Sequence, residues 1–203
     1  MRSIRVTELK SPAYQRLLSS IVVPRPIAWV GTLAADGTPN LAPFSFFTIA
    51  SSDPPTVLVS FSGQRSGRVK DSLLNARETG EFTVSLVHRE LAEVMNQSSA
   101  DYGRGVDEFQ ATGIDAAAAT LVRPPFVAGA RVALEAEVTQ VVPVADSKSV
   151  LLLGRVLMVH ADEAVLGPDG LVNAAALQPV ARLGRSEYSE LGDVFEMLRP
   201  TVD

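Results

Sequence analysis

Hydroxyl side chains are threaded through an apolar stretch, NLAPFSFFTIASSDPP at residues 40–55. Successive side chains of a strand point to opposite faces. In a single strand, this alternation would put Ser45 and Ser51 on the same face as Phe47 and Ile49. The next apolar stretch, TVLVSFS at residues 56–62, brings Ser60 and Ser62 to its end. Hydroxyls at the ends of two neighbouring strands could hold the polar edge of a ligand, or could only satisfy unpaired backbone groups.

A basic stretch that contains glycines follows directly, GQRSGRVKDS at residues 63–72. Glycines let the backbone approach a ligand closely, helix N-terminal amides favour anions, and Arg and Lys add positive charge. The residues that could cradle a phosphate in this way are Gly63, Arg65, Gly67, Arg68, Lys70 and Ser72. The stretch matches neither GxxxxGK[ST] nor GxGxxG, so a solvated basic loop is the alternative.

The residues give little support to thiol, metal or serine-nucleophile chemistry. The chain has no cysteine, which excludes disulfides, thiolate nucleophiles and iron–sulfur clusters. Its two histidines, His88 and His160, lie far apart in the sequence, so no metal site is expected. No GxSxG motif singles out a nucleophilic serine. His88 is expected on the surface. No side chain is expected to be an essential acid or base.

The charge balance and the N-terminus limit the partners. With 18 Lys and Arg against 23 Asp and Glu, the net charge is −5, which argues against nucleic acid as the main partner. The N-terminal MRSIRVTELK has no signal-peptide core, and no apolar run approaches the roughly 20 residues of a membrane span. We therefore expect a soluble cytoplasmic protein with no membrane contact.

Apolar, β-prone segments separated by turn signals must position these residues. Strands are expected at residues 27–33, from 40 onward, and at 56–62, 81–87, 131–142 and 149–160. Asp36-Gly37 predicts one hairpin, and PVADSK at residues 143–148 predicts a second. Short helices are expected at residues 70–82, closed by Gly80, and at 89–97.

This order of elements predicts the fold class. Strands joined mostly by tight turns indicate an antiparallel barrel, which leaves no exposed sheet edges. Regular βαβ alternation is missing, so a doubly wound parallel sheet is not expected. The length suits one domain over residues 1–203. Nothing after residue 161 resembles a second core, so residues 161–203 are expected to form a C-terminal extension over the barrel.

Five stretches, in this order, resemble the flavin reductase-like family of FMN-binding split-barrel proteins: RPIAWVGTLAADGTPNLAPFSFFTIASSDPPTVLVSFS, KDSLLNARETGEF, MNQSSADYGRGVDEF, GRVLMVHADE and PVARLGRSEY. The resemblance runs from about residue 20 to residue 190. It implies a mainly β, antiparallel and Greek-key-like split β-barrel with a few short helices. It also implies a homodimer with FMN, or alternatively FAD, at or near the dimer interface.

The resemblance further implies which residues meet the flavin. Serines of the 40–55 stretch would meet its polar edge while phenylalanines pack nearby, Lys70 would contact the phosphate, and Ser72 would donate from its hydroxyl. The expected cofactor-binding residues are Arg25, Asn40, Phe44, Ser45, Phe46, Phe47, Ser51, Ser52, Ser60, Ser62, Lys70, Asp71, Ser72, Asn96, Gln97, His160 and Arg182. His160 would contact flavin or nicotinamide, although a strand-end histidine can be purely structural.

The PVARLGRSEY segment is expected to close over the site through Arg182 and Tyr188. Many relatives have a second glycine where this chain has Arg185, which leaves the shape of the closing segment open.

The reaction implied by the resemblance is an NAD(P)H-dependent flavin reduction. NAD(P)H would bind transiently and pass hydride to flavin N5, with the protein supplying position and electrostatics. The family also holds reductase components of monooxygenases, so a monooxygenase or an electron-transfer protein is the expected partner. A flavoredoxin-type electron carrier without direct NAD(P)H activity is the alternative, and a structural or ligand-sensing barrel without flavin is a third.

Overall fold

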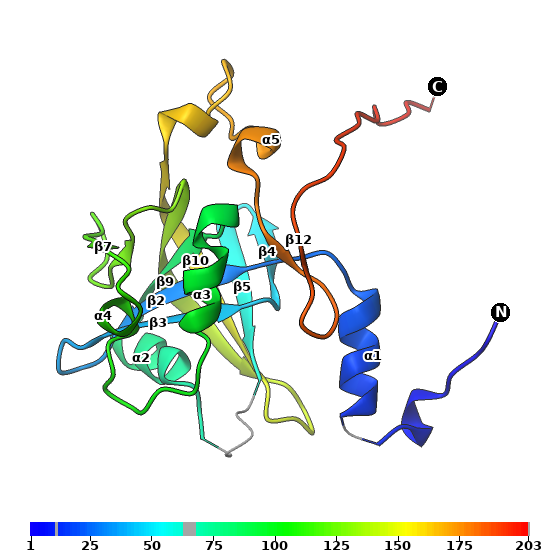
Figure 1. The fold of residues 1–203 in the computed structure, drawn as a ribbon, viewed down its shortest axis with the longest axis horizontal. Coiled ribbons are helices and arrows are strands. Elements are labelled where there is room, and N and C mark those ends of the chain that lie inside the picture. The colour runs from blue at the N-terminus through cyan, green and yellow to red at the C-terminus, as the bar shows by residue number, and fades with distance from the viewer. Residues whose placement is uncertain (11, 63–67, 203) are drawn as a thin grey trace.

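The computed structural model of this chain describes residues 1–10, 12–62 and 68–202. Seven antiparallel strands form its main sheet in the order β3-β2-β6-β9-β10-β5-β4 (Figure 1). Their bounds are β2 (Ala28–Leu33), β3 (Pro39–Phe44), β4 (Phe47–Ser52), β5 (Pro55–Phe61), β6 (Glu81–Leu86), β9 (Val132–Pro143) and β10 (Val150–Ala161). The antiparallel, mainly β fold predicted from the sequence is confirmed.

The two edge strands of this sheet are consecutive in the chain. β3 ends at Phe44 and β4 begins at Phe47, so only Ser45 and Phe46 join one edge to the other. Such a short link forces the sheet to curl until its edges meet, as in a barrel. The amide of Ser60 donates to the carbonyl of Phe46 at 2.8 Å, which fastens the link to β5.

The prediction of one strand running from residue 40 through the serines is therefore wrong. The stretch is two strands, and the register shifts again between Ile49 and Ser51. Each break resets the alternation of side chains, so the expected common face of Ser45, Phe47, Ile49 and Ser51 does not hold over its whole length.

Short helices and strands surround the barrel. They are α1 (Ala13–Ile21), α2 (Asp71–Thr79), α3 (Ala92–Gln97), α4 (Glu108–Thr112) and α5 (Ala174–Leu177), with β1 (Arg25–Pro26), β7 (Ala116–Ala117), β8 (Phe126–Val127), β11 (Ala181–Arg182) and β12 (Tyr188–Ser189). The two helices predicted from the sequence are α2 and α3, and α1, α4 and α5 are additional. Gly80 ends α2 with a φ of 76°, as expected of a C-terminal glycine.

The hairpin at Asp36-Gly37 also forms as predicted. Asp36 accepts a hydrogen bond from the amide of Thr38 at 2.9 Å, and Gly37 adopts a φ of 89°. The predicted turn at residues 143–148 joins β9 to β10. Local turn chemistry accounts for both connections.

Large apolar side chains fill the interior of the barrel. Phe82, Val59 and Leu152 are completely buried there. A Cβ added to Gly154 would lie 2.3 Å from Cζ of Phe82, so the phenylalanine ring uses the space that glycine leaves. A second cluster around Trp29 and Met95 lies under α3 and α4.

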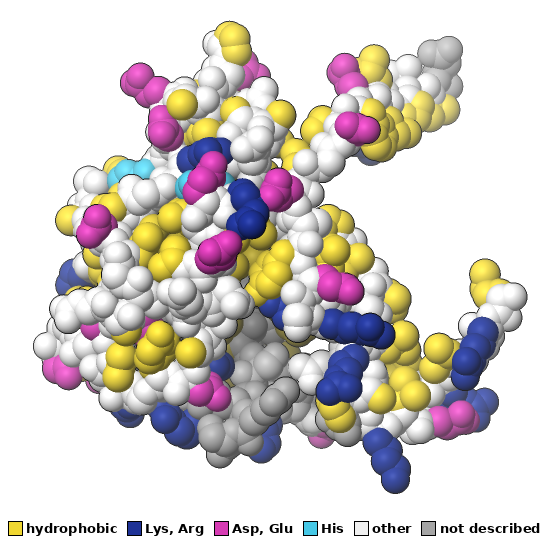
Figure 2. All heavy atoms as spheres, in the orientation of Figure 1, with side chains coloured by type: hydrophobic (Ala, Val, Ile, Leu, Met, Phe, Trp, Pro, Cys, Tyr) yellow, Lys and Arg dark blue, Asp and Glu magenta, His cyan; other side chains and the backbone are white. Residues whose placement is uncertain are grey.

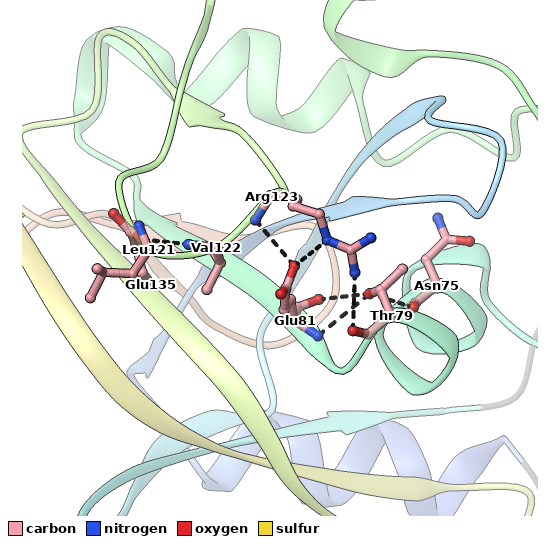
Figure 3. Close-up of polar contacts among 7 residues, drawn as sticks. All are labelled: Asn75, Thr79, Glu81, Leu121, Val122, Arg123 and Glu135. Carbon is pink, nitrogen blue, oxygen red and sulfur yellow. Dashed lines mark hydrogen bonds and ion pairs between the residues drawn. The ribbon is translucent and has the colours of Figure 1, made fainter.

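Residues 118–127, here called the strap, cross the barrel wall beside β6. Alternate residues of β6 share one face and each bind it: Glu81 accepts from the amide of Arg123, Thr83 donates to the carbonyl of Pro125, and Ser85 accepts from the amide of Val127. The side chain of Arg123 reaches back to Glu81 and to the carbonyl of Thr79 (Figure 3). Polar side chains rather than a sheet ladder thus hold the strap.

Glu135 of β9 anchors the other half of the strap. Its completely buried carboxylate accepts hydrogen bonds of 2.6–3.0 Å from three successive strap amides, those of Thr120, Leu121 and Val122. Figure 3 shows Glu135 beside Leu121 and Val122. Oε1 of Glu135 also lies 2.6 Å from Nε2 of His160. Burial alone would raise the pKa of Glu135, but these hydrogen bonds together lower it.

The C-terminal part of the chain returns to the barrel and then leaves it. β11 pairs with β1 and with β12, and residues 190–202 form neither helix nor strand. The tail extends away from the barrel (Figure 1). Apolar side chains are exposed on the tail and on α1 (Figure 2), among them Ile21, Phe195 and Leu198. Within the described residues, no helix combines the length and apolarity needed to cross a membrane.

We predict that Glu135→Gln destabilises the protein by about 2 kcal/mol at pH 7, because an amide cannot accept from all three strap amides. A carboxyl whose folded pKa is lowered contributes stability that is present above its unfolded pKa, near 4.5, and lost as pH falls through the folded pKa. Urea unfolding at pH 7 and at low pH should therefore show the cost shrinking in acid.

Glu137→Gln is the matched control, since Glu137 lies on the same strand and forms an exposed pair with Arg155. It should cost little at either pH. A cost for Glu135→Gln that stays constant with pH would contradict the role given to the carboxylate.

Candidate functional site

A cavity of about 230 Å³ opens where the β3–β4 link, the end of β5 and the start of α2 meet. The segment after α3 forms the opposite wall. Nine of the predicted site residues line it: Asn40, Phe44, Ser45, Phe46, Ser60, Ser62, Lys70, Asp71 and Ser72. Three segments that are separate in sequence are thus brought together, because the barrel closes at the link.

The rim of the cavity combines hydroxyls with aromatic rings. The link supplies Ser45 and Phe46, and the end of β5 supplies Ser60. The rings of Phe44 and Phe61 pack 4.4 Å apart between their centroids and support the rim from inside the barrel. A planar ligand with polar edges would find both kinds of partner here.

A buried hydrogen-bond network forms the floor. Asn40 donates from Nδ2 to Glu108 at 2.7 Å and accepts at Oδ1 from Ser72 at 2.7 Å and from Thr32 at 3.3 Å. Ser72 is 2% exposed, and its proton goes to Asn40. A phosphate could receive that proton only if this bond broke, so the expected donation from Ser72 is not prepared in this structure.

Sequence reasoning missed six polar residues that line the cavity: Gln15, Ser98, Ser99, Asp101, Tyr102 and Glu108. Glu108 is the buried acid among them. It is 6% exposed, and the same oxygen, Oε2, accepts from Asn40 and from the amide of Leu41. Burial raises the pKa of Glu108, and the nearby charge of Asp71 adds to the effect. Asp107 just before it caps α4 in the usual way. An acidic residue in a first helical turn is normally exposed, so the burial of Glu108 has no local signal in the sequence.

Lys70 brings positive charge to the cavity. It directly precedes α2, and its Nζ lies 3.7 Å from Oδ1 of Asp101 on the opposite wall. Asp71 pairs with Arg68 at 3.4 Å. The remaining residues of the predicted phosphate cradle, Gly63, Arg65 and Gly67, lie outside the described residues.

Arg25 has a structural task. Its guanidinium donates to the carbonyls of Ser19, Val22 and Leu183 at 2.6–2.7 Å, so it joins α1 to the closing segment. It also lines an apolar hollow of about 470 Å³ between α1 and the barrel, together with Phe46 and Phe47. The structure therefore places Arg25 and Phe47 beside the main cavity rather than in it.

The closing segment lies against the far side of the cavity. Arg182 donates to the hydroxyl of Tyr188, which donates to Asn96 at 3.1 Å. Arg182 and Tyr188 line a small hollow that shares Phe44 and Ser45 with the main cavity. Asn96 and Gln97 line another hollow on the outer side of Tyr188.

Arg185 keeps the turn that glycine would make. Its φ is 55°, in the left-handed region that costs a side chain free energy, and its carbonyl accepts from Arg182. Arg185 thus adopts a backbone conformation that glycine reaches most easily.

Three predicted site residues lie away from the cavity. Ser51 and Ser52 are at the distant end of β4, where Ser51 bonds the backbone of Asp53. His160 is held by Glu135 and stacks on Phe126, 4.7 Å between centroids. Within one chain, contact of these residues with a ligand in the cavity is not supported.

His88 is also misplaced by the sequence reasoning. It was expected on the surface, but it is 6% exposed, and burial lowers its pKa. An isolated bridge between His88 and Pro179 carries the returning C-terminal segment across it, which the local sequence does not reveal.

Comparisons with known proteins agree with this geometry. The family model described as "Flavin reductase like domain" matches residues 19–178. An uncharacterized protein of Deinococcus radiodurans is 44% identical over 97% of this chain and 88% of its own length.

Two solved structures are similar over nearly the whole chain. Nitrilotriacetate monooxygenase component B from Bacillus cereus has a TM-score of 0.92 and 29% identity, with 97% of this chain and 98% of that chain covered. The 2-nitrobenzoate 2-nitroreductase NbaA of Pseudomonas fluorescens has a TM-score of 0.88 and 26% identity, with 98% and 97% covered.

We predict that Arg185→Gly stabilises the protein by about 1 kcal/mol, because glycine adopts the left-handed conformation without steric cost. Thermal unfolding measures the change. The matched control is Glu187→Gly in the same turn, whose φ is not positive, and which should lower stability through chain entropy. A loss of stability in both variants would contradict the strain assigned to Arg185.

We predict that the stability of Glu108→Gln relative to wild type rises with pH. A carboxyl whose folded pKa is raised contributes stability that is present below its unfolded pKa, near 4.5, and lost as pH rises through the folded pKa. Glutamine keeps one oxygen for both donors and has no such loss.

Urea unfolding between about pH 4 and pH 8 tests this difference in pH dependence. Exposed Glu93→Gln on α3 serves as the control and should give a flat difference. If the difference in unfolding free energy between Glu108→Gln and wild type also stays constant with pH, ionisation of Glu108 does not affect the stability of the fold.

Proposed function

The chain belongs to the flavin reductase-like family, and we propose that it is a single-domain oxidoreductase that binds FMN and passes hydride from NAD(P)H to flavin N5. The observation that carries the proposal is the pairing of a polar cavity at Lys70 with an apolar hollow at Phe46. The two share Ser45, Phe46 and Ser60. A molecule with a charged end and an aromatic end suits this arrangement.

The residues present fit FMN at each end. Lys70, the hydroxyls of Ser60 and Ser62 and the start of α2 offer partners for a phosphate and a ribityl chain. The rim of Ser45 and Phe46 offers an aromatic surface with a polar edge. FAD, the alternative, would need room for a second nucleotide beyond Lys70.

The chain's own residues bind and orient, while the bound flavin supplies the hydride acceptor. Lys70 would neutralise phosphate charge. Asn40, held by Glu108, keeps the floor rigid, so that ligand binding requires little reorganisation. NAD(P)H is the proposed transient co-substrate, and the hollow at Arg182 and Tyr188 leaves space beside the rim.

A homodimer is part of the proposal. Large apolar side chains are exposed on three elements of the described chain, namely Leu18 and Ile21 on α1, Ile49 on β4 and Val159 on β10. A second copy covering them would also explain how Ser51, Ser52 or His160 could approach a flavin, which they do not within one chain. Light scattering at micromolar concentration measures the mass directly.

The electron acceptor is proposed from the solved neighbours. One of them is named as component B of a monooxygenase, so a monooxygenase that consumes reduced flavin is the proposed partner. A flavoredoxin-type carrier is the second candidate, and NADH oxidation by the FMN-loaded protein separates the two. Rapid turnover supports the reductase, whereas reduction only by another protein or by dithionite supports the carrier.

We predict that Lys70→Met weakens FMN binding about tenfold or more, because a charge-assisted phosphate contact is lost. Riboflavin, which has no phosphate, should bind equally well to both proteins. Flavin fluorescence quenching gives both dissociation constants. Lys148→Met in the turn between β9 and β10 is the control. Equal FMN affinity in wild type and Lys70→Met would show that Lys70 does not bind the phosphate.

A further inference from the structure

Lys70 and Asp101 face each other across the mouth of the cavity. Their side chains come from opposite walls, Lys70 from the residue before α2 and Asp101 from the segment after α3. Nζ and Oδ1 are 3.7 Å apart, and the side chains are 31% and 75% exposed. At this distance the pair is held by charge without a short hydrogen bond, so it can open without breaking one.

The other carboxylates that line the cavity are already engaged. Asp71 pairs with Arg68, and Glu108 accepts from Asn40 and from the amide of Leu41. Within the part of the chain that the structure describes, the contact with Lys70 is the only one that the carboxylate of Asp101 makes. Asp101 is thus the carboxylate in direct competition for the cation assigned to the phosphate.

We propose that Asp101 sets the affinity of the cavity for flavin phosphate by competing with it for Lys70, so that FMN exchanges instead of remaining permanently bound. This inference rests on the proposed function. It makes Asp101 a specificity-determining residue that lowers the preference for FMN over riboflavin below the level that Lys70 alone would give.

Two effects of the carboxylate act in the same direction. A phosphate that binds Lys70 must first displace Asp101, and its charge of about −1.5 to −2 then lies near a fixed negative charge. Riboflavin carries no phosphate and experiences neither effect. Because Asp101 is exposed, salt should screen its influence.

The test compares FMN and riboflavin dissociation constants for wild type, Asp101→Asn and the control Asp115→Asn. Asp115 is exposed and does not line the cavity. At low salt, Asp101→Asn should bind FMN about fivefold more tightly, with riboflavin affinity within about twofold of wild type. The gain should shrink at high salt, and Asp115→Asn should change neither constant.

Each other result overturns the inference. Unchanged FMN affinity would make Asp101 a bystander, and weaker affinity would make it a support that holds Lys70 in position. Equal tightening of riboflavin would show an effect unrelated to phosphate. If wild type binds neither flavin, the proposed function itself fails, whereas FMN binding by wild type with no change in Asp101→Asn removes this inference alone.

Discussion

A two-residue link determines the shape of this molecule. Ser45 and Phe46 must carry the chain from one edge of a seven-stranded sheet to the other, and this is feasible only if the sheet curls until β3 and β4 are neighbours in space. The bond between Ser60 and Phe46 closes the seam. The cavity lies at that seam, so the constraint that shapes the barrel also gathers the residues of the candidate site.

Two buried carboxylates lie in different parts of the fold, Glu108 at the cavity beside the seam and Glu135 under the strap. Each carboxylate accepts a hydrogen bond from at least one backbone amide, but the two pKa values shift in opposite directions. Burial dominates at Glu108 and raises its pKa, whereas three strap amides and His160 outweigh burial at Glu135 and lower its pKa. Desolvation and the number of donors both differ between the two carboxylates, and their balance sets the direction of each pKa shift.

Features governed by neighbours in sequence were predictable, and those governed by distant packing were not. Gly80 and Asp36-Gly37 act through local backbone geometry and lie where the sequence places them. The break at Ser45 has no local signal, because no glycine or proline stands between Phe44 and Ser52. The burial of Glu108 and of His88 depends on segments far away in the chain. The family resemblance led to the prediction that Lys70 and the rim residues bind a ligand. It did not reveal that His160 faces Glu135 within one chain.

The filled interior of the barrel separates the timescale of ligand exchange from that of unfolding. The ring of Phe82 occupies the space over Gly154 inside the barrel, and the cavity at the link lies on the barrel wall. Entry and departure of a ligand then need no opening of the central strands. A ligand on the wall can therefore exchange quickly, whereas we expect the amides of the central strands β6 and β9 to exchange with solvent mainly through global unfolding.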